Sequence, residues 1–279
     1  MTRALVLGGG GVAGIGWQTG LLFGLSEAGI DVTGADLVIG TSAGSTTGAQ
    51  LLSGVPLGEL YDRHVFPKGA STEIAAELDT DKMVATWGAL LNEHEPGPGL
   101  RAAIGRYALT AATVPERQRR AVIEARLPSH DWPSTPLQIV AVDAASGEER
   151  VFTQEDDVPL VDAVAASCAV PGVWPPVTIG GRRYIDGGVR SSANADLAEG
   201  HDQVLVIAPV RDFLVPEKPI TRRLKKLEKS ASLLTIRPDD ASVAAMGANP
   251  LDPAAAKPAA QAGRAQAAAV ADEVREVWS

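Results

Sequence analysis

The chain has 279 residues, 45% of them hydrophobic, and carries 34 acidic residues against 25 Lys and Arg, a formal net charge of −9. This size and apolar content suffice for a large core in one or two domains. The acidic balance disfavours a nucleic-acid-binding protein, whose binding domain would be basic. The single cysteine, Cys168, excludes a disulfide framework and a cysteine-based zinc site. We therefore expect a reducing, cytoplasmic setting and no nucleic-acid partner.

Residues 4–26 carry no charge but contain eight glycines. A membrane-spanning helix needs about 20 mostly apolar residues, and the Gly8–Gly11 run interrupts such a helix. The same run breaks the continuous apolar core of a secretory signal. Neither a membrane span nor a signal peptide is expected here.

The first fifty residues show a βαβα pattern, which indicates parallel strands. Apolar runs predict strands over 4–7 and 36–40, and helices are expected over 15–28 and 43–53. The fold class is therefore α/β, with a largely parallel central sheet flanked by helices.

The middle of the chain, about residues 56–135, is expected to be mostly helical, and strands return after it. We expect helices over 72–92 and 115–127, and strands over 137–142, 150–153, 203–207 and, at an edge, 233–236. The organisation predicted is one domain over residues 1–247. A Pro/Ala-rich linker and C-terminal helix, residues 248–279, are expected to pack on the same domain.

Gly40-Thr-Ser-Ala-Gly44 is a G-x-S-x-G motif centred on Ser42. It follows an apolar strand and opens a helix, which is the context of a nucleophile elbow, because the serine must sit on a sharp strand-to-helix turn. Glycines on both flanks avoid Cβ clashes, and the helix N-terminus favours negative charge beside Ser42. Alternatively, Ser42 only caps the helix.

Gly8-Gly-Gly-Gly-Val-Ala-Gly14 lies between the first strand and the first helix. It matches the G-x-G-x-x-G pattern of dinucleotide sites, but Asp36 lies at the beginning of the next strand, not at its end where the ribose would need it. A P-loop is excluded because no Gly-Lys-Ser/Thr follows. The loop is either a tight turn or a set of free N–H groups for an oxyanion. Because parallel strands end at one sheet edge, this loop and Ser42 should face the same crevice.

A serine nucleophile needs a proton acceptor, and the histidines are poorly placed to be one. His201 precedes the strand 203–207, so it is expected at the sheet edge opposite Ser42. The other three lie in helical or proline-flanked segments: His64, His94 and His130.

Asp186 is the better candidate base. It follows a short strand over 183–185 and opens Asp186-Gly-Gly188, where the glycines let another segment approach closely. An ordinary Asp-Gly turn is the alternative interpretation. An aspartate is a weak base at neutral pH unless an apolar pocket raises its pKa. Residues of one segment could form such a wall or belong to the core: Val170, Val173, Trp174 and Val177.

Together these segments resemble one family, the patatin-like phospholipases, over about residues 4–210. The resemblance rests on four blocks in the same order: the glycine-rich loop, the elbow, Ala166-Ser-Cys-Ala-Val-Pro-Gly-Val-Trp-Pro-Pro-Val177, and Asp186-Gly-Gly188. One departure is Ala13, where family members usually carry an arginine.

The resemblance implies a three-layer α/β/α fold and a serine–aspartate dyad without histidine. Ser42 would be the nucleophile and Asp186 the base, with an oxyanion hole formed by the N–H groups of Gly10, Gly11 and Val12. The motif glycines would be Gly9, Gly14, Gly40, Gly44, Gly187 and Gly188. No metal or organic cofactor is implied.

The function expected is hydrolysis of carboxylic esters of phospholipids or other acyl lipids through an acyl-serine intermediate. Two alternatives stay open: a non-catalytic or regulatory lipid-binding relative, which Ala13 allows, and a dinucleotide-binding oxidoreductase. A basic stretch over residues 221–229 is either a solvated helix face or a peripheral membrane contact. Its cations are Arg222, Arg223, Lys225 and Lys226.

Overall fold

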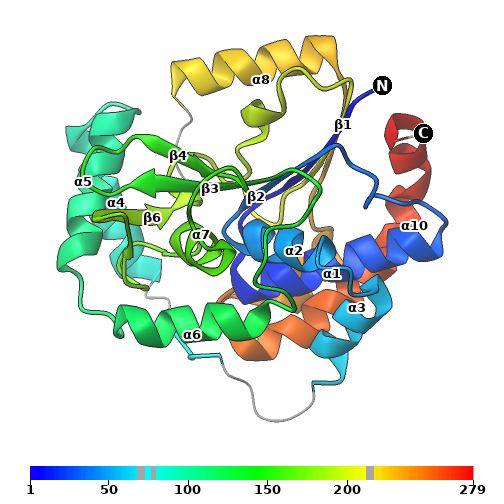
Figure 1. Ribbon diagram of the computed structural model, residues 1–279, viewed down its shortest axis with the longest axis horizontal. Helices are drawn as coiled ribbons and strands as arrows, with labels where there is room; N and C mark the ends of the chain where they lie inside the picture. Colours follow the sequence, from blue (N-terminus) through cyan, green and yellow to red (C-terminus); the bar gives the residue numbers. More distant parts are fainter. Residues whose placement is uncertain (68–72, 77–79, 212–216, 279) are drawn as a thin grey trace.

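The strands form one eight-stranded sheet in a computed structural model that describes residues 1–67, 73–76, 80–211 and 217–278 (Figure 1). The order is β5-β6-β3-β2-β1-β7-β8, with β4 paired to β3. The strands are β1 (Arg3–Leu7), β2 (Leu37–Thr41), β3 (Leu137–Asp143), β4 (Glu149–Phe152), β5 (Val177–Ile179), β6 (Arg182–Asp186), β7 (Gln203–Ile207) and β8 (Ser232–Ile236).

The central strands β3, β2, β1, β7 and β8 run parallel, whereas β4, β5 and β6 join by antiparallel pairing. The sheet is therefore mixed but mostly parallel, as the sequence predicts. Alternate residues of β1 point to opposite faces: Leu5 and Leu7 enter one core cluster, and Ala4 and Val6 enter another.

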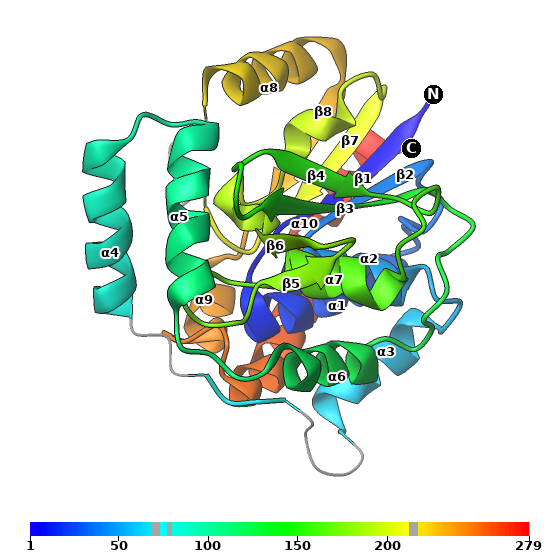
Figure 2. The same ribbon diagram turned by 60° about the vertical axis from the view of Figure 1, so that its left-hand side comes forward.

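Helices cover both faces of the sheet and form a three-layer α/β/α arrangement, with α8 on one side and α1, α2 and α10 on the other (Figures 1 and 2). The helices are α1 (Gly11–Glu27), α2 (Ala43–Leu51), α3 (Leu57–Val65), α4 (Thr80–Glu93), α5 (Pro98–Thr110), α6 (Glu116–Arg126), α7 (Leu160–Ser167), α8 (Lys218–Ser230), α9 (Asp240–Met246) and α10 (Ala256–Trp278). No helix in the described ranges is both long and apolar enough to cross a membrane.

The first helix begins at Gly11, the last glycine of the run, and not at residue 15 as expected. Its glycines serve close packing against α10. A Cβ on Gly16 or Gly20 would lie 2.4 or 2.0 Å from a backbone oxygen of Ala256 or Ala260. Tertiary contact thus offsets the poor helix propensity of glycine.

Other differences concern short or uncertain elements. Helix α7 and strand β5 were not expected, because each is short and its sequence shows no distinct hydrophobic periodicity. The expected helix over 72–92 falls partly on residues outside the described ones, and α4 covers Thr80–Glu93. The last helix has Val274 and Trp278 buried, and Nε1 of Trp278 donates a hydrogen bond to the Asp31 carbonyl oxygen (3.0 Å).

Candidate active site

Ser42 occupies the tight turn between β2 and α2 in a left-handed backbone conformation, with φ 51° and ψ −114°. Such a conformation is costly for a residue with a side chain, and the surrounding structure must impose it. The flanking glycines make the turn sterically possible: a Cβ on Gly44 would lie 1.9 Å from the Leu7 carbonyl oxygen, and one on Gly40 2.6 Å from the Cα of Ser45. The Ser42 side chain does not cap α2, so its hydroxyl is available for other chemistry.

The backbone of Ser42 is fastened by residues that sequence reasoning did not assign. The Ser167 hydroxyl accepts a hydrogen bond from the Ser42 N–H (2.9 Å) and donates one to the Val140 carbonyl oxygen (2.6 Å). The Ser42 carbonyl oxygen accepts hydrogen bonds from the Ser45 hydroxyl (2.7 Å) and the Cys168 thiol (3.2 Å). Ser167 and Cys168 both lie in the Ala166–Val177 segment. The sequence analysis singled out this segment for its resemblance to the family, but it gave no sign of contacts with Ser42.

The pairing of β3 brings Asp186 to Ser42. Strand β2 pairs with β3 up to Thr41, opposite Val140, and antiparallel β6 continues along β3 from Asp186, opposite Ala141. Because β4 occupies the other edge of β3, β2 and β6 share one edge and meet end to end. Ser42 and Asp186 therefore lie at the junction of the two strands, although they are 144 positions apart in the chain.

Burial dominates the electrostatics of Asp186, which is 5% exposed. It raises the pKa from the usual 3.8 to about 6, although interactions with the Gly188 N–H and the Ser42 hydroxyl lower it. Oδ1 accepts a hydrogen bond from the Gly188 N–H (2.7 Å). Oδ2 is buried, and no described donor reaches it in regular hydrogen-bond geometry. One carboxylate oxygen thus remains available as a proton acceptor beside Ser42.

The N-terminus of α1 presents unpaired donors to the same place. The Gly9 N–H donates to the Ser192 carbonyl oxygen (2.7 Å), and the Ala13 N–H to the Pro250 carbonyl oxygen (3.0 Å). Between them, the N–H groups of residues 10–12 form no hydrogen bond with any described residue. Free N–H groups at a helix start form a ready anion site.

Ser42, Asp186 and the glycine loop line one cavity of about 190 Å³. Val170 and Pro171 also line it, so part of the expected apolar wall lies at the site. The rest of its lining is Gly9, Gly10, Gly11, Trp87, Gly188, Val189, Ser192, Val210, Arg211, Pro250 and Leu251. Trp174 lines a smaller neighbouring cavity, and Val177 belongs to the main core cluster.

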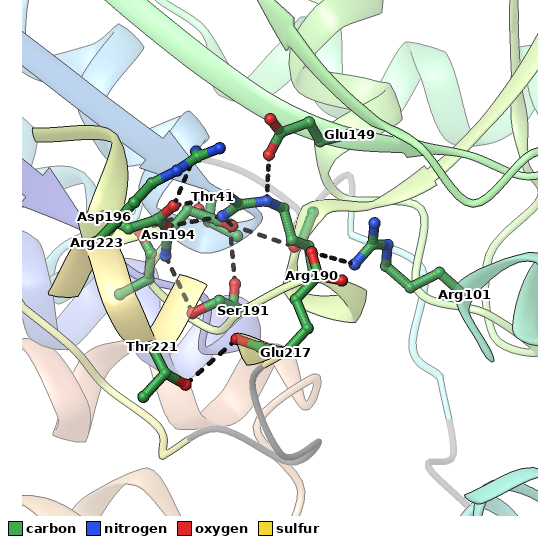
Figure 3. A network of polar contacts seen from close by, with 12 residues as sticks. Thr41, Arg101, Glu149, Arg190, Ser191, Asn194, Asp196, Glu217, Thr221 and Arg223 are labelled. Atoms are coloured by element: carbon green, nitrogen blue, oxygen red, sulfur yellow. Dashed lines mark hydrogen bonds and ion pairs between the residues drawn. The ribbon is translucent and has the colours of Figure 1, made fainter. Parts of the chain in front are cut away.

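Asn194 joins the two segments that carry Ser42 and Asp186 (Figure 3). Its buried amide donates to the Thr41 hydroxyl (3.0 Å), the Gly187 carbonyl oxygen (3.2 Å) and the Ser191 carbonyl oxygen (2.8 Å). Its Oδ1 accepts from Arg190 (2.6 Å). The sequence analysis assigned Asn194 no role.

Arg190 anchors the same network. Figure 3 shows it between Glu149 and Asp196. Its guanidinium group pairs with both Asp196 oxygens (2.8 and 2.7 Å), and Nη1 of Arg223 approaches one of them from α8 (3.3 Å). This buried, paired network fixes the loop after Asp186, because its members satisfy one another's hydrogen bonds.

No histidine lines the cavity within the described ranges. His201 lies before β7, at the sheet edge opposite Ser42, as the parallel register of β1 and β7 requires. Asp36 lies at the start of β2, where it accepts a hydrogen bond from the Arg3 N–H (2.7 Å), away from the glycine loop. In the described part of the chain, no three His, Cys, Asp or Glu side chains are grouped to hold a metal ion.

Comparison with protein-family models matches residues 5–199 to the family described as patatin-like phospholipase. The chain belongs to the patatin-like phospholipase family. Members of this family are generally lipid acyl hydrolases, so ester-bearing lipids are the substrate class that membership supports. This family match argues against a dinucleotide-binding role for the glycine loop. A search of curated protein sequences finds no significant match.

Among solved structures, the patatin-like chain is similar to VipD from Legionella pneumophila, with a TM-score of 0.51 and 13% identity. The alignment covers 98% of this chain and 67% of VipD, and it supports the shared fold. The chain also resembles ExoU from the type III secretion system of Pseudomonas aeruginosa, solved in complex with SpcU. There the TM-score is 0.44 at 16% identity, covering 100% of this chain and 53% of the other.

Proposed function

We propose that this patatin-like protein hydrolyses carboxylic esters of acyl lipids through an acyl-serine intermediate, with Ser42 as nucleophile and Asp186 as acid and base. Asp186 accepts the hydroxyl proton as Oγ of Ser42 attacks the ester carbonyl carbon. It then passes this proton to the leaving alcohol oxygen as the ester bond breaks. In the second half, Asp186 takes a proton from water, the hydroxide attacks the acyl carbon, and Ser42 regains the proton as the fatty acid leaves.

The observation that carries this proposal is that a strained serine, a buried aspartate with a raised pKa and the unpaired N–H groups of the glycine loop lie together. Gly10 and Gly11 line the same cavity as Ser42 and Asp186, and Val12 lines the smaller cavity that Ser42 also borders. The residues of the proposed oxyanion hole are Gly10, Gly11 and Val12. Their N–H groups would bind the carbonyl oxygen as it becomes negative in the tetrahedral intermediate. The apolar side chains at the cavity mouth suit an acyl chain.

Covalent labelling with a fluorophosphonate probe, followed by intact-mass measurement, tests the nucleophile. We expect one adduct on the wild type and none on Ser42→Ala, while Ser26→Ala, at an exposed helix position, is labelled like the wild type. Asp186→Asn should label at least 100-fold more slowly, because the proton acceptor is lost. Equal labelling of the wild type and Ser42→Ala would refute the assignment.

Release of fatty acid from phospholipid vesicles or short-chain esters then separates the hydrolase from a lipid-binding relative without catalysis. Ala13 motivates this second candidate, because it leaves the first turn of α1 without the arginine common in the family. A wild-type protein that binds lipid vesicles, releases no fatty acid and takes no label would favour the non-catalytic candidate.

The basic face of α8 supports a peripheral membrane contact as part of the proposal. In the structure, Arg223 pairs with Asp196 and Lys226 pairs with Glu199. Arg222 and Lys225 are exposed and form no ion pair with a described residue. Of the four cations named in the sequence analysis, these two are therefore free to meet anionic headgroups.

A further inference from the structure

Arg119 of α6 lies beside the candidate site, at a second, smaller cavity that Ser42 also lines. It is 5% exposed and lines this cavity of about 20 Å³ together with Val12, Ser42 and Ala43. Nε and Nη1 of Arg119 are buried and form no hydrogen bond with any described residue. Buried guanidinium donors are rarely left unpaired, because they lose their hydration without compensation.

The charges around Arg119 do not cancel. Glu73 is the nearby carboxylate, and Arg126 binds it through two hydrogen bonds, Nε to Oε1 (2.5 Å) and Nη2 to Oε2 (2.7 Å). Nη1 of Arg119 stays 3.6 Å from Oε2 of Glu73. Among the described residues, two guanidinium groups thus share this one carboxylate, so these three groups together carry a net charge of about +1. Arg119 is the less closely paired of the two arginines, because its contact with Glu73 is the longer one.

The position of Arg119 is fixed by its neighbours. Its guanidinium carbon lies 3.8 Å from the ring centroid of Trp174, a stacking contact that leaves the guanidinium edge free to donate hydrogen bonds. Burial and the nearby Arg126 lower the pKa of Arg119 to about 10, so the group is still protonated at neutral pH. Helix α6 packs beside α7, whose end leads to Cys168 and Trp174 (Figure 2).

We propose that Arg119 is a charged wall of the oxyanion site and stabilises the negative oxygen that forms next to Ser42 during acyl transfer. This inference rests on the proposed acyl hydrolase function. The small cavity joins Arg119 with the N-terminal turn of α1 and the residue after Ser42, so one oxygen atom there would be within reach of all three elements.

The volumes of the two cavities are consistent with one of them holding the oxyanion and the other holding the rest of the substrate. A space of about 20 Å³ is enough for about one water molecule or one substrate oxygen, but not for an acyl chain. The larger cavity of about 190 Å³ remains for the rest of the substrate. Because Arg119 comes from α6, it also places a positive charge near α1, where the side chain of Ala13 provides none.

A purely structural role, in which Arg119 only fastens α6 to Trp174, makes different predictions. Arg120 is the matched control: it is the next residue of the same helix, pairs with Asp162 and Glu124, and is half exposed. Glu73→Gln separates charge from packing, because it removes the carboxylate and makes the cluster more positive. A charge effect requires Glu73→Gln and Arg119→Met to act on the reaction in opposite directions.

The experiment measures the second-order rate constant of fluorophosphonate labelling, since the phosphonyl oxygen of the adduct occupies the oxyanion site. Arg119→Met should react about 10- to 100-fold more slowly than the wild type, and Arg120→Met within about twofold of it. Arg119→Lys keeps the charge, so its rate constant should lie between those of Arg119→Met and the wild type. Glu73→Gln should react at least as fast as the wild type.

The outcomes separate this inference from the proposed function. A wild type that takes no label on Ser42 refutes both. A labelled wild type matched in rate by Arg119→Met refutes only the role of Arg119. The role of Arg119 is also refuted if Glu73→Gln reacts slowly and Arg119→Lys reacts as slowly as Arg119→Met. In that case the rates depend on packing and not on charge. If Arg119→Met fails to fold, the Lys and Gln variants still give the decisive comparison.

Discussion

The raised pKa of Asp186 predicts that catalysis and stability depend on pH in opposite directions. Only the ionised carboxylate can accept the Ser42 proton, so the labelling rate should rise with pH to a plateau, with a midpoint near pH 6. At pH 5 we expect a rate about tenfold below the plateau.

The stability effect follows from the same difference in pKa between the folded and unfolded states. The unfolded chain has the usual value of 3.8, and the folded chain about 6. Because the folded value is the higher one, Asp186 stabilises the fold fully below pH 3.8 and loses that contribution as pH rises through about 6. The full difference corresponds to about 3 kcal/mol.

Asp186→Asn removes this titration. Its free energy of unfolding, measured by urea denaturation relative to the wild type, should therefore increase by roughly 2–3 kcal/mol between pH 4 and pH 8. The labelling rate of the wild type is measured over the same range. We expect the variant to be nearly inactive yet relatively more stable at neutral pH, as at a site where burial serves function.

Asp143→Asn is a control of opposite sign. Burial raises the pKa of Asp143, but the N–H groups of Ser146 and Ala145 outweigh it, and the resulting pKa is lowered. Its stabilising contribution is therefore present above its unfolded pKa of 3.8 and is lost only as the pH falls below that value, so the stability difference for Asp143→Asn should change little between pH 4 and pH 8. A stability difference for Asp186→Asn that stays as constant as that of Asp143→Asn over this range would refute the reasoning.

Three further predictions concern the elbow, its support and the basic helix. Gly44→Ala should destabilise the protein by at least about 3 kcal/mol in urea unfolding, because its Cβ would meet a backbone oxygen at 1.9 Å. Gly88→Ala, with open space around it, should stay within about 1 kcal/mol of the wild type. Asn194→Ala should cost about 3 kcal/mol and slow labelling, and an unchanged rate would contradict its positioning role. Neutralising Arg222 and Lys225 with glutamine should weaken salt-sensitive binding to anionic liposomes, and undiminished binding would exclude this contact.

Seven strands follow the sequence-based expectation closely: β1, β2, β3, β4, β6, β7 and β8. Most are continuous apolar runs bounded by glycine, proline or polar turns, a pattern that depends only on local sequence. The predicted start of α1 at residue 15 was wrong because glycines normally end helices, and Gly11 and Gly14 were therefore left outside it. In the structure the helix includes them, and close contact of Gly16 and Gly20 with α10 stabilises it. A contact between residues about 240 positions apart leaves no local signal.

The site divides in the same way. Ser42, the glycine loop and Asp186 were proposed from motifs, because chemistry of this type needs particular residues at particular turns. Ser167, Asn194 and Arg119 were not assigned, since each comes near the candidate site from another segment of the chain. Their roles depend on hydrogen bonds and charges that appear when those segments meet.

The sequence by itself determined the fold class, the order of the strands along the chain, the elbow turn and the family, because these follow from local apolar patterns and short motifs. Only the tertiary structure decided that β2 and β6 meet end to end on β3, which brings a hydroxyl and a carboxyl group together. It also decided the burial that raises the pKa of Asp186 and the position of Arg119 3.6 Å from Glu73. Burial and net charge belong to the packed arrangement of many segments, and no short stretch of sequence encodes them alone.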